Sequence, residues 1–288
     1  MKTKTSILGI LFCILFALCL CFVGSRGDAV ILNSYPLFAI CGFISFVLHW
    51  AVFVPSYLFK TEHFFDITGS VCYLVILNFA IYYKPEIDFR SQIIFCLISI
   101  WTIRLGSFLF LRVKRKGLDR RFTVMKTKFW WFLFTWTMSG LWVLITSGPA
   151  VAVLTTDVTK AISWMGYLGI ILWVIGFTIE VTADNQKSAF LAKEKNKDNF
   201  INSGLWAWSR HPNYFGEILL WFGVSLLALP VLSGLQLVTL VSPVFVYFLL
   251  TKISGIPMLE ARADKKWGGS PNYIVYKKNT PSLFPSKP

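Results

Sequence analysis

Residues 129–151 read FWWFLFTWTMSGLWVLITSGPAV, an uninterrupted run without a charged side chain. A helix rises 1.5 Å per residue, so a run of this length crosses about 30 Å of hydrocarbon and predicts a membrane-spanning helix. The whole chain has the same bias, because 56% of its 288 residues are hydrophobic and only 15% are charged. A soluble domain carries about 25% charged residues, and a fold of this length could not bury so much apolar surface.

Seven further apolar runs surround this one. They cover residues of about 6–23, 36–59, 67–83, 91–111, 161–181, 215–230 and 233–253. Some are shorter than the roughly 20 residues that a spanning helix needs. The expected fold class is therefore all-α, a polytopic transmembrane bundle of seven or eight spans. We expect one membrane domain over 36–288, preceded by a segment 1–35 that is either a signal anchor or a cleaved signal peptide with a short loop.

Basic residues gather in alternate loops. The stretch Arg112–Lys128 holds eight basic residues and one acid, and basic residues also outnumber acids over 182–214 and from Lys252 onward. The positive-inside rule predicts that these three segments, and both chain ends, are cytosolic. The net charge of +14 thus indicates topology and contact with anionic membrane lipids rather than nucleic-acid binding. The six cysteines lie inside apolar segments without metal-ligand spacing, so no metal is expected.

Ionisable residues inside the apolar runs are the first functional signal. Arg104 lies within the fourth run, where such a group costs about 2.5–3.5 kcal/mol near the bilayer centre. Glu180 and Asp184 end the sixth run and are followed by Lys187, and spacings of four and three place these three on one helical face. If these ionisable side chains face one shared polar cavity, each of them avoids the free-energy cost of contact with hydrocarbon. Alternatively, the side chains reach the interface or pair with one another between helices.

Residues 204–217 read GLWAWSRHPNYFGE and form the most distinctive motif. Pro212 suits the first turn of a helix, which would start at the cytosolic surface. The positive end of that helix, flanked by Arg210 and His211, can hold a phosphate or carboxylate. Asn213 and Glu217 lie one turn apart on this helix and would line the wall of the site below its cytosolic opening. The aromatic and basic tail that follows the last span either lies on lipid headgroups or folds back over a cofactor.

This motif belongs to a larger pattern. It is preceded by Glu180 and the sequence Asp184-Asn-Gln-Lys187, and it is followed by Leu259-Glu260 and Tyr273-X-X-Tyr276. The combination, over residues 36–285 with its cofactor motifs in 180–285, resembles the steroid 5-alpha-reductase C-terminal-domain superfamily. Within it, the chain is similar to a branch of uncharacterised multi-spanning membrane proteins. Segments 65–70, 101–106 and 119–122 also match that branch.

The resemblance implies an NADPH pocket that opens to the cytosol and hydride transfer onto a carbon–carbon double bond of a lipid or sterol-like substrate. It also implies the endoplasmic reticulum as location if the cell is eukaryotic. The implied cofactor-binding residues are Asp184, Lys187, Arg210, His211, Asn213, Tyr214, Glu217, Arg262, Tyr273 and Tyr276. The candidate catalytic residues are Asp66, Arg104 and Glu180.

One position departs from the pattern. Steroid reductases use a tyrosine to polarise the substrate carbonyl, and Trp101 stands where that tyrosine would fall. An indole N–H donates a hydrogen bond but is not an acid. Four nearby residues could replace that tyrosine, and the sequence does not choose among Glu62, His63, Asp66 and Tyr73. The missing tyrosine also argues against a steroid as the substrate.

Two other functions remain open from the sequence. Membrane methyltransferases that use S-adenosylmethionine, such as the isoprenylcysteine type, share an Arg-His-Pro-X-Tyr-like motif, a following glutamate and tail tyrosines. They are usually shorter and lack the set that runs from Asp184 to Lys187. A non-enzymatic lipid-binding membrane protein is the third possibility, and Trp101 in place of a proton donor favours it.

Overall fold

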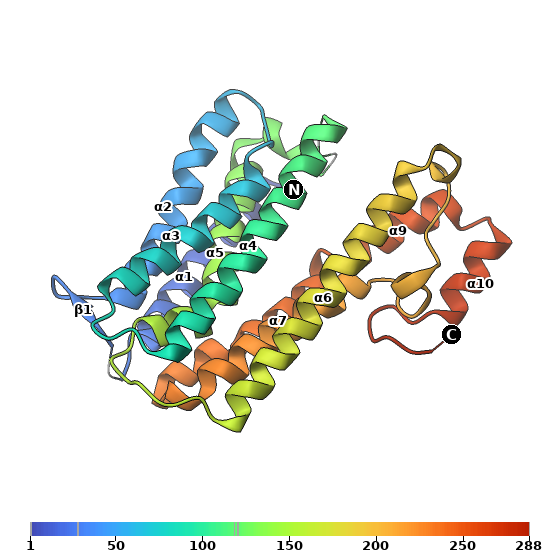
Figure 1. Cartoon of the computed structure of the whole chain (residues 1–288). Helices are drawn as coiled ribbons and strands as arrows, with labels where there is room; N and C mark the ends of the chain where they lie inside the picture. Colours follow the sequence, from blue (N-terminus) through green and yellow to red (C-terminus); the bar gives the residue numbers. More distant parts are fainter. Residues whose placement is uncertain (1, 28, 118, 120, 288) are drawn as a thin grey trace. The chain divides into compact units, whose positions relative to one another are not determined.

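A computed structural model describes residues 2–287 except 28, 118 and 120, and it is almost entirely helical (Figure 1). Its helices and strands are α1 (Thr3–Gly24), β1 (Ile31–Leu32), β2 (Tyr35–Pro36), α2 (Leu37–Leu58), α3 (Phe65–Tyr83), α4 (Phe89–Lys116), α5 (Phe129–Leu154), α6 (Trp164–Ala192), α7 (Pro212–Ala228), α8 (Ser242–Phe248), α9 (Ile256–Trp267) and α10 (Pro271–Asn279). The short helical turns are η1 (Met125–Thr127), η2 (Glu194–Asn196), η3 (Gly204–Ala207), η4 (Leu229–Val231), η5 (Gly234–Val241) and η6 (Leu249–Ile253). Among the described residues, eight helical segments are long and apolar enough to span a membrane, which confirms the predicted polytopic bundle.

The contacts divide the chain into two compact units, one of Met1–Trp164 with Leu227–Ser242 and one of Met165–Leu226 with Pro243–Pro288. In the first unit α5 is the central helix, and α1, α2 and α3 all pack against it while α4 packs on α3. The apolar run at 129–151 therefore forms the core of this unit. Segment 227–242 is tied to it by hydrogen bonds, such as the one that Ser242 Oγ donates to the Thr146 carbonyl over 2.8 Å.

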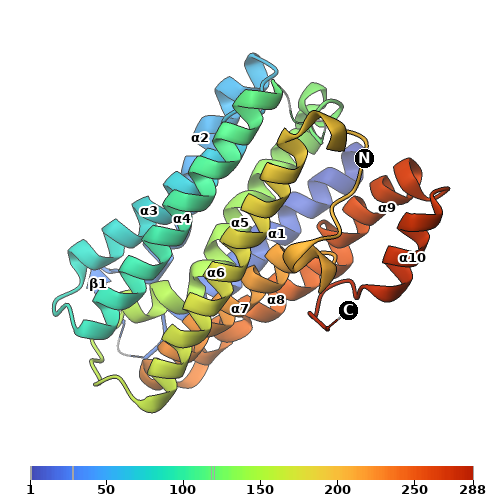
Figure 2. The same cartoon turned by 45° about the vertical axis from the view of Figure 1, so that its right-hand side comes forward.

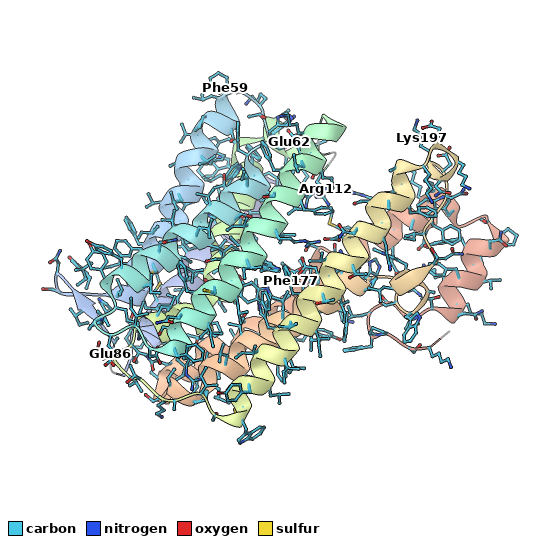
Figure 3. All side chains as sticks on the ribbon, in the orientation of Figure 1. Phe59, Glu62, Glu86, Arg112, Phe177 and Lys197 are labelled. Atoms are coloured by element: carbon cyan, nitrogen blue, oxygen red, sulfur yellow. The ribbon has the colours of Figure 1, made fainter. Side chains whose placement is uncertain are left out.

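Successive helices of the first unit alternate in direction. Phe59, Glu62 and Arg112 lie at one end of this unit, and Glu86 lies at the other (Figure 3). The second end also holds the antiparallel β1–β2 hairpin and Lys84, whose ammonium donates to the carbonyls of Val153 over 3.0 Å and Thr156 over 2.6 Å. Burial lowers the pKa of Lys84. The alternation predicted from the loop charges holds within this unit, and the side of the membrane on which each end lies stays a prediction.

The second unit is built on α6 and α7, which run side by side (Figures 1 and 2). Gly169 and Gly176 of α6 meet Gly223 and Gly216 of α7 backbone to backbone. Both pairs are spaced by seven residues, which is two helical turns, so they lie on one face of each helix. Small residues at such positions allow close helix packing in membranes.

Helix ends differ from the predicted runs in two places. The sixth apolar run was expected over 161–181, whereas α6 continues to Ala192. Its last turns are polar and lie beyond the apolar stretch. The eighth run, expected over 233–253, is built from η5, α8 and the π-helical turn η6. The helix is then interrupted at 254–255 before α9 begins. The prediction that Pro212 lies in the first turn of its helix is confirmed, because α7 starts there.

Candidate functional site

The contact between α6 and α7 positions the first polar pair of the site. A Cβ atom on Gly216 would lie 2.5 Å from the Gly176 carbonyl oxygen and 2.7 Å from the Glu180 nitrogen, so only glycine allows this approach. One turn farther along, Asn213 Nδ2 donates to Asp184 Oδ1 over 3.3 Å. The Asp184 residue is only 8% exposed. The sequence-predicted residues of the two helices are therefore brought together by their glycine contact.

Three further predicted residues lie on the same helices. Glu180 is buried on α6, and Glu217 is half-buried on α7. The Lys187 ammonium lies 4.5 Å from the centre of the Trp206 ring, a cation–π contact. The indole N–H of Trp206 in turn donates to the Ala183 carbonyl over 3.0 Å. This part of α6 thus presents two carboxylates and one ammonium group within two turns.

Arg210 fastens the C-terminal tail. Its Nε donates to Glu260 Oε1 over 2.9 Å, and its Nη2 lies 2.8 Å from the same oxygen. Its Nη1 donates to the carbonyls of Lys277 over 2.7 Å and Thr280 over 2.5 Å, and its backbone N–H donates to the Pro281 carbonyl. All three guanidinium nitrogens are therefore engaged within the protein, and a ligand phosphate would have to compete with these bonds.

His211 is a buried residue of this site with one ring nitrogen left unpaired. Its side chain is 8% exposed and its ring stacks on Tyr214, with 5.7 Å between centroids and planes 10° apart. Its Nε2 lies 3.4 Å from Glu260 Oε1, while Nδ1 is buried without a hydrogen-bond partner among the described residues. Burial lowers the pKa of His211, although the Glu260 carboxylate opposes the shift. The ring is thus neutral at pH 7, Nε2–H donates to the carboxylate, and Nδ1 is an acceptor.

The two tail tyrosines are used in folding the tail back. Tyr273 donates its hydroxyl to Asp264 over 3.1 Å, and Tyr276 donates to the Trp206 carbonyl over 2.7 Å. Both rings contact Phe200, at centroid distances of 5.2 and 5.3 Å. Burial raises the pKa of Tyr273 to about 12 and also raises that of Tyr276. The tail therefore folds back onto its own unit, and its contact with a cofactor or with lipid headgroups stays a prediction.

Arg262 stands apart from this network. It is exposed on α9, and none of the hydrogen bonds or ion pairs among the described residues involves it. The structure therefore does not bring it to the other predicted cofactor residues, and its role stays a prediction.

The two remaining candidates, Asp66 and Arg104, belong to the first unit. Arg104 is half-buried on α4, with its guanidinium carbon 5.2 Å from the centre of the Phe108 ring. Asp66 begins α3 and forms ion pairs with Arg112 at 3.8 Å and Arg121 at 3.5 Å. These contacts give Asp66 a charge-neutralising role in the basic loop that follows α4. Arg120 of the same loop lies outside the described residues.

Glu62 is the buried anchor of that loop. It is 3% exposed, accepts the Asp119 N–H over 3.0 Å and forms an ion pair with Lys126 at 2.5 Å. Burial raises the pKa of the Glu62 carboxyl, but Lys126 and the Asp119 N–H together outweigh it, so that the net pKa is lowered. Its stabilising contribution is therefore complete above the usual pKa of 4.5 and is lost as the pH falls through the folded value.

Replacing this carboxylate should release the loop. In Glu62→Gln the amide cannot pair with Lys126, whose ammonium is left beside a neutral group, and we expect a loss of about 2 kcal/mol of local stability. Trypsin should then cut after Arg121 and Lys126 at least tenfold faster. The exposed Glu86→Gln is the matched control and should be cut like the wild type. Equal cleavage of both variants would show that Glu62 does not hold the loop.

Comparison with protein families adds one match. The profile of DUF1295, a family described as protein of unknown function, covers residues 52–280. The chain belongs to the DUF1295 family. No curated protein and no solved structure matches it. The DUF1295 match begins within α2 and ends at Thr280, so it includes the α6–α7 contact and the residues that Arg210 fastens.

The sequence did not single out two residues of this candidate site. Glu260 was noted only as part of a motif, yet it receives both Arg210 and His211. The sequence did contain a hint, because Glu260 is one of two acidic residues in a strongly basic tail and is therefore expected to pair with a basic side chain. Ser209 was also missed, and its hydroxyl accepts the His211 N–H over 3.1 Å and donates to the Leu283 carbonyl over 2.8 Å. A serine hydroxyl that accepts the N–H two residues later forms a local turn, and serine is common in such turns.

Proposed function

We propose that this membrane protein is an NADPH-dependent reductase of a carbon–carbon double bond, conjugated to a carbonyl, in a lipid or sterol-like substrate. Two facts support the proposal. The motifs over 180–285 resemble those of steroid 5-alpha-reductases, and the DUF1295 match extends over these motifs as far as residue 280. The eight apolar helices suit a substrate that reaches the protein through the bilayer.

The observation that carries the proposal is the unsatisfied Nδ1 of His211, two residues before Asn213, which pairs with Asp184. A buried polar atom without a partner is costly, and it is expected where a ligand completes the hydrogen bonding. Carboxylates and amides suit ribose hydroxyls and the carboxamide of a nicotinamide, and the Lys187 ammonium suits a phosphate. The residues present thus fit the polar groups of NADPH.

Within this proposal the residues divide into binding and positioning roles. Asp184, Asn213 and Glu217 would hydrogen-bond hydroxyl and amide groups of NADPH, and Lys187 would hold a phosphate. The neutral His211 acts as an acceptor at Nδ1, so it would receive a hydroxyl or amino hydrogen rather than hold a phosphate. Arg210 would position the tail, and a ligand phosphate would reach it only by displacing one of its present hydrogen bonds.

Bound NADPH would supply a hydride to the electron-poor carbon of the double bond, and a proton from the protein or from water would go to the neighbouring carbon. The protein would contribute orientation and charge stabilisation at the carbonyl. Arg104 and Glu180 remain the candidate groups for this charge stabilisation. The ion pairs of Asp66 with Arg112 and Arg121 favour a structural role for it.

Substitution of the polar pair tests the proposed site. Asn213→Ala and Glu217→Ala should each weaken NADPH binding about tenfold, because each removes one ligand hydrogen bond from a partly buried site. Binding would be measured by the change in NADPH fluorescence on the detergent-purified protein. Asn272→Ala, at an exposed position of α10, is the matched control and should bind like the wild type. Wild-type affinity in both pocket variants would remove Asn213 and Glu217 from the site.

A further inference from the structure

A cavity lies between the N-terminal ends of α1 and α5 in the first unit. It is an open pocket of about 660 Å³, lined by Lys2, Thr3, Ser6, Lys128, Phe129, Trp130 and Trp131. A volume of roughly 300–1,000 Å³ is typical of small-molecule sites. The cavity belongs to helices that contribute none of the proposed cofactor residues, so it needs an explanation of its own.

The lining of this cavity selects an anion. It contains two ammonium groups, from Lys2 and Lys128, and none of its lining residues is acidic. Among the described residues neither lysine forms an ion pair, and the Lys128 ammonium lies 6.0 Å from the centre of the Trp131 ring. Two uncompensated positive charges in a concave site attract a negatively charged group.

The helix ends strengthen this preference. α1 and α5 both begin at the cavity, and neither has a side-chain cap on its first turn. Each helix is longer than 20 residues and presents the positive end of its dipole there. The hydroxyls of Thr3 and Ser6 add polar groups within reach of a phosphate ester, although Ser6 already donates to the Lys2 carbonyl.

The surroundings of the cavity select a lipid over a soluble anion. Along α1, the apolar side chains of Leu8, Leu11 and Leu15 are each more than half exposed and lead away from the cavity. Phe129 and Trp130 at its rim are about 40% exposed, and tryptophan concentrates at the level of lipid headgroups. An amphiphile would place its charged end among the lysines and its acyl chains along α1.

We propose that this cavity binds the headgroup of an anionic phospholipid, with the phosphate between Lys2 and Lys128. The loop charges independently predict that this end of the first unit is cytosolic, where anionic lipids gather. The bound lipid bridges the first turns of α1 and α5 and so fastens the N-terminal helix to the central one.

The test uses native mass spectrometry of the full-length, detergent-purified protein, titrated with phosphatidylglycerol or with phosphatidylcholine of the same acyl chains. Lys2→Gln/Lys128→Gln should bind phosphatidylglycerol about 30-fold more weakly, since each lysine near a lipid surface contributes about fivefold. Lys128→Gln alone should lose about fivefold. The matched control is Lys114→Gln/Lys195→Gln, which removes two exposed lysines outside the cavity and should bind like the wild type.

Three results separate the possible occupants. Unchanged phosphatidylcholine binding by the cavity variant shows that it is folded, so its loss of phosphatidylglycerol then supports the headgroup site. Equal phosphatidylglycerol affinity in the cavity variant and the wild type would overturn the proposal. Displacement of the lipid by an equal concentration of glycerol phosphate would overturn the lipid assignment, because it would indicate a site for soluble phosphate esters.

Discussion

Arg210→Met should release the C-terminal tail from the second unit. The substitution removes the guanidinium that holds the Glu260 carboxylate and the carbonyls of Lys277 and Thr280. The side chains of Arg210 and Glu260 are 14% and 20% exposed, so the pair is largely shielded from solvent. Breaking a buried pair from one side costs about 3–5 kcal/mol. We expect a loss of about 3 kcal/mol, because Lys277 and His211 still partly neutralise Glu260.

Amide hydrogen exchange over residues 256–286 measures this effect. In Arg210→Met the protection of this segment should fall by about two orders of magnitude. Arg210→Lys keeps the charge but cannot reach Glu260 and two carbonyls at once, so it should restore protection only in part. Arg262→Met removes an exposed arginine of the same segment and serves as the control. A tail that stays protected in Arg210→Met would show that the aromatic contacts of Phe200 hold it without the arginine.

Gly216→Ala should separate α6 from α7. The added methyl group would lie within 2.7 Å of backbone atoms of Gly176 and Glu180, which cannot rotate away as a side chain can. The helices must therefore move apart, and we expect a loss of about 3 kcal/mol, the upper range for overpacking. The Asn213–Asp184 hydrogen bond, one turn away, should weaken with it. The melting temperature of the purified protein should fall by about 6 °C.

Gly69→Ala provides the matched control for this substitution. A Cβ atom on Gly69 would meet only the Ser139 hydroxyl, at 4.0 Å, so the methyl group fits without a shift. Alanine also favours the helix by up to about 1 kcal/mol relative to glycine. The control should therefore melt at or slightly above the wild-type temperature. A Gly216→Ala variant as stable as Gly69→Ala would mean that the two helices do not depend on this close contact.

Most of the helical framework was predictable because the bilayer imposes it. Apolar runs must be near 20 residues and must be helical, so hydropathy alone located all eight spans. The start of α7 at Pro212 followed from the stereochemistry of proline. The spacing of Glu180, Asp184 and Lys187 predicted helix as far as Lys187, but the end of α6 at Ala192 was not predicted, because no membrane constraint marks it.

The site was only partly predictable. Local spacing placed Glu180, Asp184 and Lys187 on one face of α6, and the structure retains that arrangement. Which groups satisfy Arg210 could not be read from the sequence, since its partners at Glu260 and Thr280 lie 50 or more residues away. The folding back of the tail depends on these distant bonds and on Phe200, a residue without any motif.

Cofactor-dependent thermal stability tests the central claim most directly. The detergent-purified protein would be melted with NADPH, NADH and S-adenosylmethionine in parallel, because a ligand stabilises the folded state that binds it. At 100 times its dissociation constant a ligand adds about 2.7 kcal/mol. We expect NADPH alone to raise the melting temperature, and Asn213→Ala to abolish that rise at the same concentration. Stabilisation by S-adenosylmethionine instead of NADPH would contradict the account and indicate a membrane methyltransferase.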